Sequence, residues 1–166
     1  MVYLHLPPST PHIEGKSCKL FLAGTIDMGE SYDWQSEIYH FIANKFNLCC
    51  VDIFNPRRPD WNKSWSQYPV HPILRRQIEW ELECLERADI IALVLMSNSL
   101  SPISLMELGA FKDKQMLIFC PHDFWRRANV EVFVKKYKNP NIIIEDWDLY
   151  KIALKRLVEA YILKLS

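Results

Sequence analysis

Residues 90–111, IIALVLMSNSLSPISLMELGAF, decide the fold that we expect for this chain. They open with a continuous apolar run, Ile90–Met96, whose length and β-branched start are typical of a buried strand. Beyond the polar residues 97–99, apolar side chains recur at helical spacing, which predicts a helix from about Ser104. A buried strand that leads into a helix is typical of a parallel α/β sheet. Glu107 is therefore expected in the first turn of a helix at the carboxyl end of a strand.

Glu107 is the first candidate for chemistry. In open α/β sheets, ligands bind in the crevice at the carboxyl ends of the strands, and a carboxylate in this helix would face that crevice. The helix N-terminus favours the ionised form of Glu107, which is the form that a nucleophile needs. The same position also suits a glutamate that only complements the helix dipole, so position alone leaves both interpretations open.

The rest of the chain repeats this alternation of strands and helices. Further strands are expected at 19–24, 49–54, 116–120 and 141–144, and helices from about Asp33, over 73–87 and over 147–165, while 129–137 suits either a helix or a β-like stretch. This order predicts an α/β fold of the doubly wound, flavodoxin- or Rossmann-like type, with a five-stranded parallel sheet in a single domain over 18–166. Residues 1–17 show no periodicity and are expected to form an extended N-terminal arm.

Length and composition are those of one globular domain. The 166 residues contain 20 lysines and arginines against 20 aspartates and glutamates, so no global field indicates nucleic acid or an anionic membrane as a partner. Neither a membrane-spanning run nor a signal-peptide pattern occurs, which predicts a cytoplasmic protein. The 5 cysteines are expected to be free thiols. Because CxxC and HExxH motifs are absent, we expect no metal and no cofactor.

A second carboxyl group stands out in the helix expected over 73–87. At about 100° per residue, Ile78, Leu82, Leu85 and Ala88 mark the inward face of this helix. Glu81 falls between Leu85 and Ala88, inside this apolar arc. An inward glutamate is costly unless it is paired or lines a cleft. We favour a cleft that Glu81 shares with Glu107. The structural alternatives are a carboxylate at the edge of the helix that bends toward solvent, or one that pairs with an arginine such as Arg75 or Arg76.

The loop from Asn55 to about Pro72 is unusually long for a connection within a compact domain. Its prolines and tryptophans argue against disorder. Its arginines, Arg57 and Arg58, suit a phosphate group, and its tryptophans suit stacking on a planar ligand. A surface loop that is packed by its own tryptophans explains the composition equally well.

Several common motifs of nucleotide-binding proteins and hydrolases do not occur. The sequence contains no GxGxxG, no GxxxxGK[ST] and no GxSxG. The polar residues that remain near the strand ends are carboxylates, hydroxyls and arginines. This set suits chemistry at the anomeric carbon of a sugar, where one carboxylate attacks an oxocarbenium-like centre and a second acid assists the leaving group.

Five segments together carry a family resemblance: FLAGTIDMG, NPRRPDW, EWELECLERADII, SPISLMELGAF and FWRRANVE. In combination they resemble the nucleoside 2-deoxyribosyltransferase superfamily, and most closely its 2-deoxyribosyltransferase-like branch, over about residues 18–137. The deoxynucleoside 5′-monophosphate N-glycosidases belong to the same superfamily. The resemblance implies an α/β fold and an enzyme that acts on the N-glycosidic bond of a nucleoside or nucleotide.

The resemblance also implies roles for individual residues. Glu107 matches the nucleophile of the family, and Glu81 matches a helix aspartate that assists departure of the base. Ser101 matches a serine that contacts phosphate in the monophosphate glycosidases. The other expected substrate contacts are Gly24, Thr25, Ile26, Asp27, Asp33, Arg57, Arg58, Asp60 and Asn129.

Two positions depart from the family pattern. Phe21 stands where the family often has a tyrosine whose hydroxyl orients the nucleophile. Ser101 stands where the transferases have an aspartate, which favours a substrate that carries phosphate.

The function implied is cleavage of the N-glycosidic bond of a (deoxy)nucleoside or nucleotide through a glycosyl-enzyme intermediate. A second base as acceptor makes the protein a transferase, and water makes it a hydrolase of the deoxynucleoside 5′-monophosphate type. An NAD glycohydrolase would use the same nucleophile. A nucleotide-binding or sensor domain without catalysis would keep the pocket alone. The family further implies a small-molecule nucleoside or nucleotide as partner, and a homo-oligomer.

Overall fold

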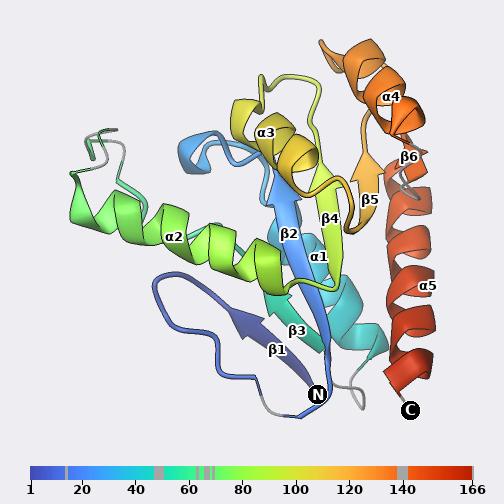
Figure 1. Cartoon of the computed structure of the whole chain (residues 1–166), viewed down its shortest axis with the longest axis horizontal. Coiled ribbons are helices and arrows are strands. Elements are labelled where there is room, and N and C mark those ends of the chain that lie inside the picture. Colours follow the sequence, from blue (N-terminus) through green and yellow to red (C-terminus); the bar gives the residue numbers. More distant parts are fainter. Residues whose placement is uncertain are drawn as a thin grey trace.

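The structure is a computed structural model that describes residues 1–13, 15–46, 51–62, 64–65, 68, 70–137 and 142–165. Its helices alternate with the strands of one sheet (Figure 1). The strands are β1 (Val2–His5), β2 (Cys18–Gly24), β3 (Val51–Phe54), β4 (Ile90–Val94), β5 (Gln115–Phe119) and β6 (Ile142–Ile144). The helices are α1 (Trp34–Lys45), α2 (Pro72–Arg87), α3 (Pro102–Ala110), α4 (Arg127–Lys136) and α5 (Trp147–Leu165), with a short 3₁₀ turn η1 at Asp27–Gly29. The expected strand residues 49, 50 and 141 lie outside the described residues.

The sheet is parallel throughout, and its strand order is β1-β3-β2-β4-β5-β6. Without β1, the order of the other five strands is β3-β2-β4-β5-β6, which is the flavodoxin-like order. The predicted α/β fold class is therefore confirmed. The predicted number of five strands is wrong, because the sheet has 6.

The additional strand is β1, which lies in the segment expected to be only an extended arm. It runs parallel to β3, with Val2 opposite Val51 and His5 opposite Phe54. The Nε2 atom of His5 lies 2.6 Å from Oδ1 of the buried Asp52 on β3. A strand of 4 residues is too short to display a period, and its pairing depends on a partner far along the chain. The sequence pattern therefore could not reveal it.

Both faces of the sheet are covered by helices. Helices α1 and α5 pack on one face, where Trp34 and Tyr150 are among the largest fully buried side chains. Helices α2, α3 and α4 pack on the other (Figure 1). Strand β4 contributes alternate residues to the two cores: Ile90, Ala92 and Val94 to the first, and Ile91 and Leu93 to the second. This burial on both faces explains the unbroken apolar run in the sequence.

Helix α3 differs in detail from the expectation, and helix α4 resolves an open one. Helix α3 begins at Pro102 and not near Ser104, so that Glu107 is its sixth residue and lies beyond the first turn. The segment 129–137, which could have been helix or strand, is largely helix α4. Within the described ranges, no helix is long and apolar enough to cross a membrane.

The buried face of α2 is rotated from the predicted one. Ile78 and Leu82 were expected to point inward, but they are 46% and 45% exposed. The buried residues of α2 are Leu74, Gln77, Trp80, Cys84 and Leu85. The buried face contains the polar Gln77 and the bulky Trp80, which the apolar pattern did not include. The pattern therefore placed the centre of the buried face too far toward Ile78 and Leu82. The rotation turns Gln77 and Glu81 toward a cavity.

Candidate functional site

A cavity of about 420 Å³ opens at the carboxyl ends of β2 and β4. Helices α2 and α3 form two of its walls, and the loop between β3 and α2 forms a third. Its lining includes Gly24, Thr25, Ile26, Asp27, Pro56, Arg58, Trp61, Gln77, Ile78, Glu81, Leu82, Ser101, Ile103, Met106 and Glu107. This is the crevice in which ligands bind to open α/β sheets, and its size suits a small organic molecule.

Gly24 is required by the close approach of the two central strands. It has a φ of +142°, and a Cβ atom there would collide with the carbonyl oxygen of Val94 on β4. Directly after it, the backbone N–H of Thr25 donates to that same oxygen at 2.9 Å. Only glycine therefore lets β2 end against β4 and start the turn that follows.

Two carboxyl groups face this cavity from different helices. Glu107 of α3 is 9% exposed, and Glu81 of α2 is half-buried. Burial, and then the charge of Glu81, raises the pKa of Glu107 to about 8. Burial likewise raises the pKa of Glu81 to about 7, although a hydrogen bond from Gln77 acts in the opposite direction. The expectation that the helix terminus keeps Glu107 ionised is therefore not met, because Glu107 lies beyond the first turn and desolvation outweighs the dipole.

The hydroxyl groups at the ends of β2 and β4 form one network. The Oγ1 atom of Thr25 lies 2.6 Å from Oγ of Ser101, and the two serine hydroxyls of Ser99 and Ser101 are 3.0 Å apart. Ser99 also donates to the Asp27 carboxylate at 2.7 Å. Asp27 and Ser101 both have positive φ angles, 47° and 44°. Such backbone conformations are costly outside glycine and are often found at ligand sites.

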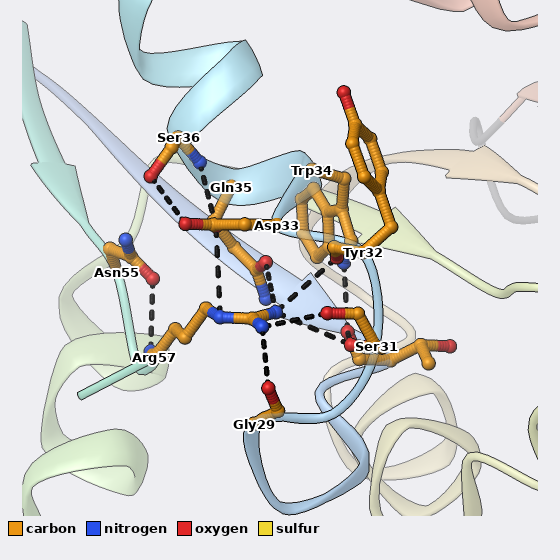
Figure 2. A network of polar contacts seen from close by, with 10 residues as sticks. Gly29, Ser31, Tyr32, Asp33, Trp34, Gln35, Ser36, Asn55 and Arg57 are labelled. Atoms are coloured by element: carbon orange, nitrogen blue, oxygen red, sulfur yellow. Dashed lines mark hydrogen bonds and ion pairs between the residues drawn. The ribbon is translucent and has the colours of Figure 1, made fainter. Parts of the chain in front are cut away.

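Arg57 lies outside the cavity and clamps the loop between η1 and α1 (Figure 2). Its Nη2 donates to the carbonyl oxygens of Gly29 and Ser31, at 2.9 and 2.7 Å. Its Nη1 reaches the carbonyl oxygen of Tyr32 at 3.3 Å, and its Nε lies 3.7 Å from a carboxylate oxygen of Asp33. Asp33 in turn is the N-cap of α1. The two residues expected to contact substrate are thus engaged with each other and with the backbone.

This arrangement predicts that Arg57→Lys destabilises the fold. Lysine cannot reach several carbonyl oxygens at once, because it lacks the planar fork of donors. We expect a loss of about 2–3 kcal/mol in the free energy of unfolding, the sum of a few hydrogen bonds to a charged group. Urea denaturation measures this loss. Lys45→Arg, at the exposed end of α1, is the matched control and is expected to leave stability unchanged; equal stability of Arg57→Lys would show that the clamp is dispensable.

Arg58 is buried beside the cavity and already has a counter-ion. Its Nε and Nη2 atoms donate to the two carboxylate oxygens of Asp60, at 2.7 and 2.6 Å. Its guanidinium carbon lies 4.9 Å from the ring centre of Trp65. The third nitrogen, Nη1, is buried and has no partner within the described part of the chain. Asp60 itself is largely exposed and does not line the cavity.

Gln77 on the cavity wall was not singled out by sequence reasoning, and Trp61 was expected only as one of the loop tryptophans that could stack on a ligand. Gln77 is 2% exposed, and its Nε2 donates both to the carbonyl oxygen of Pro56, at 2.9 Å, and to Glu81 Oε1, at 2.6 Å. Trp61 lines the same wall, with its indole nitrogen buried. Gln77 precedes Glu81 by one helical turn, and that spacing was the available signal for it.

Other expected positions lie elsewhere. Asn129 lines a second cavity of about 330 Å³ between α3 and α4, away from the two glutamates. Phe21, at the position where the resemblance led us to expect a tyrosine, is fully buried in the core beneath α2 and α3. Among the described residues, no group of histidine, cysteine, aspartate and glutamate side chains is placed to hold a metal ion.

Known proteins are similar to this chain in sequence and in structure. The family model described as "Nucleoside 2-deoxyribosyltransferase like" matches residues 17–124, which include β2, α2, α3 and the whole cavity lining. None of the curated proteins matches the chain. A crystal structure of a conserved protein from Enterococcus faecalis V583 is similar with a TM-score of 0.49 and 12% sequence identity, and the match covers 90% of this chain and 98% of that one.

Proposed function

We propose that this chain, which belongs to the nucleoside 2-deoxyribosyltransferase-like family, cleaves the N-glycosidic bond of a nucleoside through a covalent glycosyl-enzyme intermediate. The observation that supports this most directly is the pair of carboxyl groups in one cavity, Glu107 and Glu81, whose pKa values are both raised and whose charges interact. Such a pair can hold one proton near neutral pH. That proton lies more often on Glu107, whose pKa is the higher of the two, so the reactive form, with Glu107 ionised and Glu81 protonated, is the less populated of the two singly protonated forms.

The reaction proceeds in two displacements. In the first, a carboxylate oxygen of Glu107 forms an ester bond to C1′ while the bond from C1′ to the base nitrogen breaks, and Glu81 gives its proton to the departing base. In the second, an acceptor attacks C1′, the ester bond breaks, and Glu81 takes up the proton that the acceptor loses. The acceptor is water in a hydrolase and the nitrogen of a second base in a transferase.

The polar groups on the β2 and β4 side of the cavity suit the sugar. Asp27 and the linked hydroxyls of Thr25 and Ser101 offer hydrogen-bond acceptors and donors to sugar hydroxyls. The apolar side chains of Ile103 and Met106, on α3, suit the faces of the sugar and the base.

The state of the arginines favours a nucleoside over a 5′-phosphorylated nucleotide. Arg57 is occupied by backbone carbonyl oxygens, and the charge of Arg58 is balanced by Asp60. A phosphate would bring two negative charges toward a cavity that already has two glutamates. The monophosphate glycosidase activity is therefore the second candidate, supported by Ser101 alone.

Release of free base, followed by liquid chromatography, tests the proposal. The panel consists of nucleosides, 2′-deoxynucleosides, their 5′-monophosphates and NAD, each with and without a second free base. We expect release from nucleosides to exceed release from the matching monophosphates by about tenfold or more, because the described residues that line the cavity offer a phosphate no uncompensated cation. Dependence on the second base identifies a transferase, and release without it identifies a hydrolase.

Two outcomes contradict the proposal. Release of nicotinamide alone would indicate an NAD glycohydrolase. Binding of nucleosides or nucleotides without release of any base would indicate a sensor domain that uses the cavity for binding only.

A further inference from the structure

Three buried polar atoms on the α2 and loop side of the cavity have no hydrogen-bond partner among the described residues. They are Nη1 of Arg58, Nε1 of Trp61 and Oε1 of Gln77. Arg58 and Trp61 stand on the loop after β3, and Gln77 is tied to the same loop by its hydrogen bond to Pro56. Buried polar groups in proteins are nearly always hydrogen-bonded. Unpartnered atoms of three neighbouring side chains therefore point to a ligand group that satisfies them.

The orientation of the Gln77 amide is determined by its neighbours. The carbonyl oxygen of Pro56 can only accept a hydrogen bond, so the atom 2.9 Å from it must be the amide nitrogen. That nitrogen has two hydrogens, and the second is used by Glu81 at 2.6 Å. The unpartnered atom is thus a carbonyl oxygen, and it requires a donor on the ligand.

The two other atoms require acceptors. Arg58 Nη1 and Trp61 Nε1 can only donate. Because Asp60 balances the charge of Arg58, the wall as a whole offers two donors and one acceptor without net charge. A phosphate cannot satisfy this set, since its oxygens would meet the carbonyl oxygen of Gln77.

A single chemical group satisfies all three atoms. In a lactam, a ring carbonyl stands beside a ring N–H: the carbonyl oxygen accepts two hydrogen bonds, and the N–H donates one. We propose that Arg58, Trp61 and Gln77 read the leaving base, and that they select bases with a lactam edge, such as hypoxanthine, guanine, uracil and thymine, over adenine and cytosine. This inference rests on the proposed function, because it takes the base of a nucleoside as the ligand.

The position of Gln77 connects this reading of the base with the proton donor. One residue holds the carboxyl group of Glu81 through its nitrogen and contacts the base through its oxygen. All three atoms are screened from water in this structure, so the loop side chains must part as the base enters. The correct base then regains hydrogen bonds that an amino base leaves unmade.

Two pairs of substrates that differ only in this group test the inference. They are 2′-deoxyinosine against 2′-deoxyadenosine and 2′-deoxyuridine against 2′-deoxycytidine, compared by kcat/KM for base release. We expect the lactam member of each pair to be favoured by at least about tenfold, the effect of one hydrogen bond to a buried partner. Trp61→Phe keeps an aromatic ring and removes the indole N–H donor. It is expected to reduce the ratio of kcat/KM values within each pair at least about threefold.

The control is Trp125→Phe, at the second cavity, which is expected to leave both preferences unchanged. Equal rates within the pairs, a preference for the amino bases, or an unchanged preference in Trp61→Phe would overturn the inference and leave the proposed function standing.

Failure of the proposed function has a different signature. If none of the four deoxynucleosides releases its base, their dissociation constants measured by calorimetry replace the rates. Tighter binding of both lactam members, weakened in Trp61→Phe, would support the reading of the base without catalysis. Equal binding, or no binding of any of the four, would overturn it.

Discussion

Glu107→Gln is expected to lower base release by at least about 10⁴-fold while the protein remains folded. Removal of a nucleophile that forms the covalent intermediate typically costs a factor of this size or more. Glutamine has the shape of the protonated glutamate but cannot attack C1′. The measurement is kcat/KM for the best substrate of the panel, with circular dichroism to establish that the fold is retained.

The same substitution is expected to stabilise the protein at alkaline pH. The pKa of Glu107 is raised from 4.5 in the unfolded chain to about 8 in the folded one, so the folded state binds more protons between these values. The free energy of unfolding of the wild type therefore falls as the pH rises through this window. The glutamine variant keeps its free energy of unfolding, because glutamine does not titrate. We expect a gain of about 2–4 kcal/mol at pH 9 and little at pH 4.

An exposed glutamate of α2 provides the control for both effects. Glu83→Gln, on the outer face of that helix, is expected to change neither activity nor the dependence of stability on pH. If Glu107→Gln released base at the wild-type rate, the covalent mechanism would be excluded. If its stability followed the wild-type curve between pH 4 and 9, the buried carboxyl group would not titrate as described.

The pH dependence of kcat/KM is expected to be a narrow bell between about 7 and 8. These values belong to the coupled pair, and the active form holds one proton. Below about 7 both carboxyl groups are protonated, so the nucleophile is missing; above about 8 both are ionised, so the acid is missing. On each side kcat/KM should fall about tenfold per pH unit.

Glu81→Gln separates the two limbs of this bell. It is expected to reduce kcat/KM by about 10²–10⁴-fold, the usual contribution of a general acid, and to abolish the alkaline limb. The acid limb should then follow the pKa of Glu107 alone, which lies below about 8 because the charge of Glu81 no longer raises it. A bell that keeps both limbs in this variant would show that another group supplies the proton.

The fold was largely predictable because most of its elements repeat one pattern. The apolar run at Ile90–Met96 has no polar face, since both faces of β4 are buried, and that is the signature of a parallel sheet. The edge strand β1 has no such signature. The face of α2 was misplaced because the buried Gln77 resembles a surface residue in the sequence, although its partners lie in the loop at Pro56 and on Glu81.

The candidate site was predictable where the carboxyl ends of neighbouring strands bring residues together. Thr25 after β2, Ser101 after β4 and Glu107 on the helix that follows meet in one cavity for this reason. The arginines of the long loop could not be placed, because their partners are backbone carbonyl oxygens and a nearby aspartate that no periodicity reveals. The roles of all these residues toward a substrate stay predictions.

The edge strand β1 has a consequence for the order in which the protein assembles. It is synthesised before its partner strand β3, and because Val2 pairs with Val51, it must wait until about 50 further residues have been synthesised. Until β3 is made, the four residues of β1 have no ladder to join. Strand β1 therefore cannot form its sheet pairing early, and on a ribosome stalled before residue 54 it would be unpaired.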